Sequence, residues 1–303
     1  MSIMRLGYVH ARVTDLEASR RHYSDTLGLE VKAEGDGKLY FKGWDEYDHH
    51  SVVVEEGGVG VVKFGYKCSH LADLERYETA LQAFGVTVER MSEGDNLAVG
   101  DGVRFISPTN HVFELYHEME YAGTETGTLN PEVFPRNLRG VGVPRLDHSL
   151  ITGDDVEGME RLFIECFGWH ISERVISSPD EPVCLATFMS AGHKAHDLAV
   201  LKGPDAKLHH FAFILDDWNA VLRAGDIFAM DDVPVDIGPT RHAITRGTTI
   251  YFFDPSGNRN EVFAGSYLSC ADFPTITWTA DQLGRAVFYH SRELNDRFLT
   301  VFT

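Results

Sequence analysis

An internal repeat constrains the fold of this chain more than any other feature of its sequence. Residues 8–29 have the pattern of a strand followed by a helix that begins at Asp15 and ends before Gly28. Residues 148–169 repeat this plan and place Gly168 at the same point. Glycine suits the position after a helix because it adopts left-handed backbone angles without steric cost. The chain is therefore predicted to contain two copies of one structural plan.

A closing hairpin in each half extends this repeat. Residues 103–114 correspond to residues 250–261, and in both segments a glutamate follows a proline by six residues. In the second hairpin, the turn residues are Asp254-Pro255-Ser256-Gly257. Between these ends, each half shows a further strand, helix and strand. Each half is thus predicted to hold two βαβββ units, which makes the fold class α+β.

The repeat and the turn-rich segments predict the domain boundaries. Residues 1–135 are expected to form an N-terminal domain of two βαβββ modules without metal, and residues 136–280 a catalytic domain of two modules with a metal site. Residues 124–135 and the Gly140-Val141-Gly142 segment are the predicted linker. The tail, residues 281–303, is expected to pack on the core as a helix followed by a strand or apolar flap.

The charge and hydropathy of the chain exclude several kinds of partner. A net charge of −19 argues against nucleic acid, because backbone phosphates require clustered Lys and Arg. No apolar run approaches the roughly 18 residues of a membrane helix, so no membrane partner is expected. The first residues lack the apolar segment of a signal peptide, and the four cysteines form no CxxC pair. A cytoplasmic protein with reduced, packed thiols is expected.

Histidine and carboxylate residues on separate predicted strands of the second half suggest a metal site. His148 lies on its first strand, His209 and His210 on a middle strand, and Glu261 on its last strand. A carboxylate within an apolar strand is costly to bury unless it is paired or binds a metal. Two histidines and one carboxylate suit non-haem Fe(II), although zinc accepts the same ligands. Glu261 can equally pair with a nearby arginine.

Strand alternation selects one of the two adjacent histidines. Neighbouring residues of a strand point to opposite faces, so His209 and His210 are not expected to bind the same metal. His209 shares its face with large apolar residues that would pack under helices, whereas His210 shares its face with Ala212. His210 is therefore the predicted ligand. The first half has Tyr8 in the position of His148 and leaves Glu114 without ligand partners, so metal is expected only in the second half.

A longer motif of the second half resembles a known family. Thr240-Arg241-His242, Ile250-Tyr251, Asp254-Pro255-Ser256-Gly257 and Glu261 resemble the signature of the type I extradiol ring-cleaving dioxygenases of the vicinal oxygen chelate superfamily. Further segments resemble the catechol 2,3-dioxygenases within that family: Arg145-Leu146-Asp147-His148, Lys194-Ala195-His196-Asp197, Leu208-His209-His210 and residues 277–284. The resemblance implies tandem βαβββ modules in two similar domains, each a funnel-like, partly closed barrel.

The resemblance also implies roles for individual residues. It makes His148, His210 and Glu261 ligands of Fe(II). His196 would be an acid–base residue beside the metal, and His242 and Tyr251 would contact the substrate hydroxyls. Two aromatic residues are predicted by position to line the substrate pocket, Phe188 and Phe298. His193, close to His196 in sequence, is considered a decoy.

The implied function is extradiol cleavage of catechol or substituted catechols by O2, giving products of the 2-hydroxymuconic semialdehyde type in aromatic compound degradation. One alternative is a bicyclic catechol substrate such as 2,3-dihydroxybiphenyl. Another is a metal-dependent lyase or isomerase of glyoxalase type, and a third is a non-catalytic binding protein of the same fold. The resemblance implies a homotetramer, and the choice between iron and manganese stays open.

Overall fold

Four βαβββ units follow one another along the chain in the computed structural model, which describes residues 3–303. The first two units are, in order, β1 Ile3–Val13, α1 Leu16–Arg20, β2 Glu30–Gly35, β3 Lys38–Lys42, β4 Val52–Glu56, β5 Gly60–Cys68, α2 Ala72–Phe84, β6 Val88–Met91, β7 Gly102–Ile106 and β8 Val112–Tyr116. The next two are β9 Arg145–Gly153, α3 Val156–Phe167, β10 His170–Ile176, β11 Cys184–Ser190, β12 Leu198–Lys202, β13 Lys207–Ile214, α4 Trp218–Met230, β14 Val235–Arg241, β15 Gly247–Phe253 and β16 Arg259–Gly265. The tail adds β17 Ile276–Thr279, α5 Leu283–Val287 and α6 Asp296–Thr300.

Aspartate side chains begin three of the helices. Asp15, Asp155 and Asp217 each accept a hydrogen bond from the backbone N–H three residues later, at the start of α1, α3 and α4. Such a cap satisfies an N–H group that has no partner within the helix. The predicted helix start at Asp15 is confirmed, and Gly168 ends α3 with a φ of 70°.

Two sheets contain all the strands of the described chain. The first has the order β2-β3-β4-β1-β5-β8-β7-β6, and the second has the order β14-β15-β16-β13-β9-β12-β11-β10-β17. In each sheet two units meet through an antiparallel pair, β1 with β5 and β9 with β13. Residues 117–144 join the sheets without a named helix or strand. The predicted α+β fold of paired βαβββ modules is confirmed.

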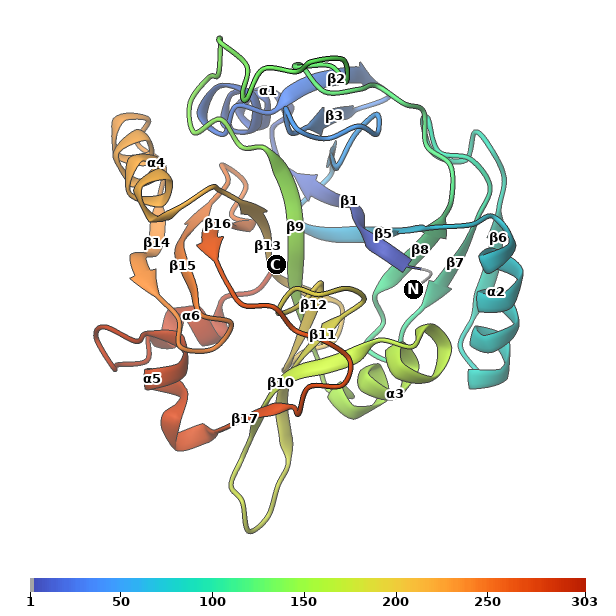
Figure 1. Cartoon of the computed structure of the whole chain (residues 1–303), viewed down its shortest axis with the longest axis vertical. Helices are drawn as coiled ribbons and strands as arrows, with labels where there is room; N and C mark the ends of the chain where they lie inside the picture. Colours follow the sequence, from blue (N-terminus) through green and yellow to red (C-terminus); the bar gives the residue numbers. More distant parts are fainter. Residues whose placement is uncertain (1–2) are drawn as a thin grey trace.

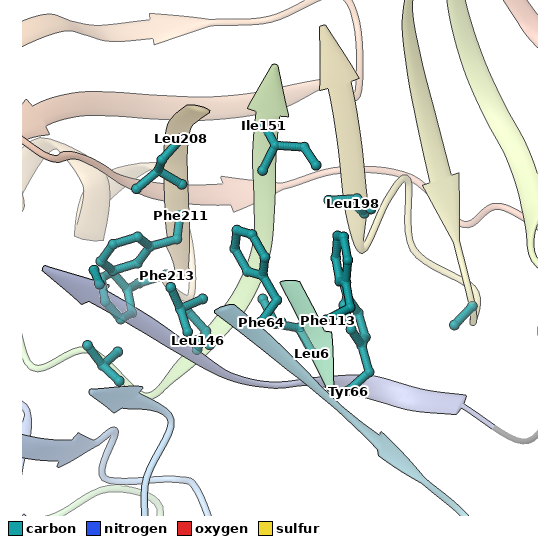
Figure 2. Close-up of a cluster of buried hydrophobic side chains, with 14 of the residues drawn as sticks. Leu6, Phe64, Tyr66, Phe113, Leu146, Ile151, Leu198, Leu208, Phe211 and Phe213 are labelled. Atoms are coloured by element: carbon teal, nitrogen blue, oxygen red, sulfur yellow. The ribbon is translucent and has the colours of Figure 1, made fainter. Parts of the chain in front are cut away.

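The two halves share one hydrophobic core. Phe64 of the first sheet lies between Phe113 of that sheet and Phe211 and Phe213 of the second (Figure 2), and all four belong to a single buried cluster. Polar contacts reinforce the junction: the Tyr23 hydroxyl donates to Asp254 at 3.0 Å. Because this interface is large and apolar, the second sheet is held against the first as one body.

The C-terminal tail lies beside β14 and β15, where α5 and α6 appear in red (Figure 1). The expected helix over residues 281–287 is confirmed by α5. Residues 297–302 were expected to form a strand or an apolar flap, and the strand is wrong because residues 296–300 form α6. Asn295 explains the difference: its side chain accepts a hydrogen bond of 2.9 Å from the Arg297 N–H and so begins a helical turn.

Candidate metal centre and active-site cavity

Three adjacent strands bring His148, His210 and Glu261 together. Ala212 of β13 lies opposite His148 of β9 on one side and opposite Glu261 of β16 on the other. His210 lies two residues before Ala212, so its side chain shares the same face of the sheet. The potential ligand atoms of the three side chains all lie within 4.8 Å of one another. No other set of three such residues was found in the part of the chain from 3 to 303.

The donor atoms of this cluster fit a divalent metal ion. Nε2 of His148 and Nε2 of His210 each lie 3.1 Å from Oε2 of Glu261, and all three residues are at most 4 % exposed. Nε2 of His210 makes no hydrogen bond within the described chain, although it is buried. A buried nitrogen without a partner is costly, and coordination to a metal would satisfy it. Two imidazoles and one carboxylate leave half of an octahedron open for other ligands.

Burial and mutual charge set the protonation of the cluster. Burial raises the pKa of Glu261, but a hydrogen bond with His148 and the proximity of the His210 imidazole outweigh this and hold that pKa well below its usual range. Burial lowers the pKa of His210 to about 4. For His148, burial is outweighed by hydrogen bonds with Asp147 and Glu261, so its pKa is raised. A metal ion can bind only the form of His148 that has no proton on Nε2.

Asp147 orients His148 from the side opposite the cluster. Its carboxylate accepts a hydrogen bond of 2.9 Å from Nδ1 of His148, which leaves Nε2 directed toward Glu261. Lys194 lies 3.2 Å from the same carboxylate, and its charge helps to hold the pKa of Asp147 well below normal. Carboxylates in this position fix the ring orientation of metal-binding histidines.

His196 lies against the cluster on the loop between β11 and β12. The centre of its ring is 4.1 Å from that of His148 and 5.2 Å from that of Phe188, which meets it edge to face. Burial, followed by the charge of His148, lowers the pKa of His196 well below its usual value. The imidazole is therefore neutral near pH 7, the form that can take up a proton.

His242 and Tyr251 form a hydrogen-bonded pair on the other side of the cluster. Nδ1 of His242 faces the backbone carbonyl of Val287, which can only accept, so the ring proton lies on Nδ1. Nε2 is then the acceptor for the Tyr251 hydroxyl at 2.9 Å. Burial lowers the pKa of His242 and raises that of Tyr251 well above 10.0, so both groups are neutral.

All the predicted site residues line one cavity of about 130 Å³. Its walls include the metal candidates and the acid–base candidates together with the two predicted aromatic residues: His148, His210, Glu261, His196, His242, Tyr251, Phe188 and Phe298. These residues come from strands as far apart in the sheet as β11 and β15, which requires the sheet to curve around the cavity. His193 is exposed and does not line the cavity, as expected for a decoy.

The expected surroundings of His209 are wrong. The pairing of β13 with β9 shifts register between Leu208 and His210, so His209 is the extra residue of a β-bulge. Its ring lies 4.6 Å from the ring of Phe298 in α6 of the tail, and not under the helices of the βαβββ units. The structure places His210, on the face that it shares with Ala212, in the cluster.

Comparison with known proteins shows what this chain is similar to. Residues 145–262 match the model of the Glyoxalase/Bleomycin resistance protein/Dioxygenase superfamily, and residues 63–120 match that of the catechol 2,3-dioxygenase-like N-terminal domain. A metapyrocatechase from Pseudomonas sp. (strain CF600) is 44% identical over 99% of this chain and 99% of its own length.

The chain belongs to the type I extradiol ring-cleaving dioxygenases. Among solved structures, the 2,3-dioxygenase LapB from Pseudomonas sp. KL28 has a TM-score of 0.89 and 40% identity, covering 93% of this chain and 99% of that one. The homoprotocatechuate 2,3-dioxygenase from Arthrobacter globiformis has a TM-score of 0.87 and 28% identity, covering 99% and 91%. A manganese-dependent 2,3-dihydroxybiphenyl 1,2-dioxygenase from Geobacillus genomosp. 3 is 27% identical over 96% of this chain and 95% of its own length.

As an extradiol dioxygenase, the chain is an oxidoreductase that uses O2. Several residues that organise its cavity were not found by sequence reasoning. Asp147 adjoins a predicted ligand, which was the one available signal, whereas the carbonyls of Val287 and Phe298 carry no sequence signal at all.

No helix in residues 3–303 has the length and apolar character needed to cross a bilayer.

Proposed function

We propose that this extradiol dioxygenase opens the ring of catechol or a substituted catechol beside its two hydroxyl groups, with Fe(II) held by His148, His210 and Glu261. The convergence of these three side chains in one buried cavity is the observation that carries the proposal. When bound, the metal would supply a template for the two catechol oxygens and the redox chemistry with O2.

His242 and Tyr251 are suited to receive the substrate. Nε2 of His242 is the unprotonated nitrogen of that ring, so it can take a proton from a catechol hydroxyl. Tyr251 can turn its hydroxyl to donate to a substrate oxygen while its ring stays packed 4.8 Å from that of Phe298. A catechol that loses a proton here would bring a negative charge toward the bound metal cation, which would favour its binding.

His196 is suited to move a second proton. Its neutral imidazole can accept a proton from the second hydroxyl group of the bound catechol. It can later donate that proton to the oxygen atom that leaves when the O–O bond breaks. The ring of His196 adjoins His148, so a proton held there lies beside the reacting atoms. Phe188, packed edge to face on His196, limits the positions that this imidazole can take.

The dimensions and walls of the cavity favour a monocyclic substrate. An apolar cavity of about 150 Å³ accommodates benzene, and the volume here is about 130 Å³. Phe188, Leu150, Ile244 and Phe263 line the wall and would hold a flat ring by burial. A bicyclic catechol would require this wall to move.

Metal identity, assembly and location are further proposals. We favour iron, as expected from the resemblance, although one relative is described as manganese-dependent. A homotetramer is expected from the resemblance alone, and a cytoplasmic location from the hydropathy of the chain. Gel filtration and cell fractionation would test these two expectations.

The experiment for the proposed function is anaerobic purification, metal quantification, and then addition of catechol in air. We expect about one iron per chain, uptake of O2, and a yellow ring-opened product. Turnover of 2,3-dihydroxybiphenyl in preference to catechol would favour the bicyclic alternative. Product formation without O2 uptake would favour a lyase or isomerase, and metal-free protein without turnover would favour a binding protein.

A further inference from the structure

His209 lies between the metal cluster and the C-terminal tail, and the chemistry above gives it no role. Its side chain is 1 % exposed. Nε2 of His209 lies 2.8 Å from the backbone carbonyl oxygen of Phe298. Nδ1 of His209 lies 2.7 Å from Nδ1 of His210. His209 thus connects a ring of the cluster to a backbone group of the tail.

These two contacts determine where the protons lie. A carbonyl oxygen can only accept, so the proton of His209 lies on Nε2, and its Nδ1 has a free electron pair. The contact between the two Nδ1 atoms then requires His210 to be the donor. With its proton on Nδ1, His210 presents an electron pair at Nε2 toward Oε2 of Glu261, 3.1 Å away, and a bound cation would join these two acceptors. If His209 carried its proton on Nδ1 instead, the electron pair of its Nε2 would face an electron pair of the Phe298 carbonyl oxygen.

We propose that His209 is a positioning residue that fixes the proton of His210 on Nδ1 and so prepares Nε2 to bind the metal. This inference rests on the proposed metal-binding role of His210. Metal-binding histidines usually donate their second N–H to a carboxylate, a backbone carbonyl or water. Asp147 accepts such a hydrogen bond from His148. Nδ1 of His210 instead donates to Nδ1 of His209, and Nε2 of His209 donates to the carbonyl of Phe298 in the tail.

The segment of the tail that supplies this carbonyl is held firmly. Arg259, which is buried, donates to the carbonyl of Val301 at 2.9 Å and to that of Arg297 at 3.3 Å, on both sides of Phe298. The backbone of Thr303 exchanges two hydrogen bonds with Leu208, at 2.8 and 3.0 Å. The tail therefore holds His209 at two points. One is the backbone of Leu208, which precedes His209 in β13, and the other is Nε2 of the His209 ring.

Two substitutions of His209 distinguish positioning from simple packing. His209→Leu fills the space but removes the acceptor for Nδ1 of His210. In His209→Asn the side-chain oxygen takes the place of Nδ1 and restores that acceptor. We expect His209→Leu to lose Fe(II) to a chelator about 10–100-fold faster than the wild type, and His209→Asn to recover most of the difference. His193→Leu, at an exposed histidine outside the cavity, is the matched control and should release the metal at the wild-type rate.

A second measurement needs no variant. In 15N spectra of the wild type labelled at histidine and loaded with diamagnetic Zn²⁺ in place of iron, His209 should carry its proton on Nε2 and His210 on Nδ1. The opposite tautomers would overturn the proposal, and so would a metal release from His209→Leu no faster than from the wild type. If the wild type itself binds no metal, the proposed function fails instead, whatever the tautomers are.

Discussion

The ammonium group of Lys63 lies 3.0 Å from the carboxylate of Glu114, and this pair takes the place in the first half that His210 and Glu261 take in the second. Gly65 lies opposite Glu114 as Ala212 lies opposite Glu261, so Lys63 and His210 share one register position. A fixed cation of the protein thus neutralises the first carboxylate, and metal is proposed only at the second.

Removing the Lys63 cation should destabilise the fold. Burial raises the pKa of Glu114, but Lys63, Tyr8 and Arg104 outweigh this and lower it. Lys63→Met leaves a buried carboxylate with Arg104 as its one remaining cation, which should cost about 3 kcal/mol in the free energy of unfolding measured with urea. The control is Arg136→Met, whose exposed pair with Glu132 should contribute less than about 1 kcal/mol. Equal losses in the two variants would contradict this account of Glu114.

The two equivalent glutamates should respond differently to metal. Fe(II) at about 100 times its dissociation constant should stabilise the wild type by about 2.7 kcal/mol. Glu261→Gln removes a proposed ligand and should abolish this gain, whereas Glu114→Gln should keep it even though the variant is less stable. Anaerobic thermal denaturation with and without Fe(II) measures both effects. A gain retained in Glu261→Gln would count against the ligand assignment.

Removing the imidazole of His196 should lower the turnover of catechol without lowering the metal content. His196→Ala is expected to retain iron while its turnover of catechol falls by about 10²–10⁴-fold, the usual contribution of a general acid–base residue. His193→Ala, on the same loop but exposed, is the control and should turn over at the wild-type rate. Metal content and initial rates of O2 uptake test this together. Unchanged turnover with iron retained would refute the assignment.

His111 should make stability depend on pH at the junction of the two halves. Its Nε2 donates to the carbonyl of Lys207 at 3.1 Å, and burial lowers its pKa to about 4. The unfolded chain has a pKa of about 6.5 at this residue, so it binds the proton first as the pH falls. Stability is therefore complete above about pH 6.5 and is lost progressively toward pH 4.

The variant His111→Gln keeps the donor to Lys207 but does not titrate. Between pH 7 and pH 5 the wild type should lose about 2 kcal/mol more free energy of unfolding than the variant. Other buried histidines contribute equally to both proteins, so the difference isolates His111. Parallel losses in the two proteins would show that His111 is not the group responsible.

Local patterns predicted much of the fold and the site, because alternation along a strand and the turn at Asp254 depend on neighbouring residues. The side of the sheet that carries His210 followed from the small Ala212 beside it. The bulge at His209 has no local signature, since it depends on how β13 pairs with β9. The segment of Phe298 has the aromatic and β-branched composition of a strand, yet the Asn295 cap makes it helical.

Several of the contacts that sequence reasoning missed join distant parts of the chain. Asp254 was predicted as a turn residue, and its carboxylate does accept from the N–H of Ser256 at 2.9 Å. It also accepts from Tyr23, which binds the turn to the first half. Glu114 was expected to lack ligand partners, whereas Lys63 supplies a charge instead. Such pairings depend on the tertiary fold and not on spacing along the sequence.

The most direct measurement is an anomalous scattering map from crystals of the protein loaded anaerobically with Fe(II). The account predicts one iron peak per chain, coordinated by Nε2 of His148, Nε2 of His210 and a carboxylate oxygen of Glu261, with open coordination positions facing the cavity. A peak that any of these three side chains fails to reach, or one at Glu114 in the first half, would contradict it.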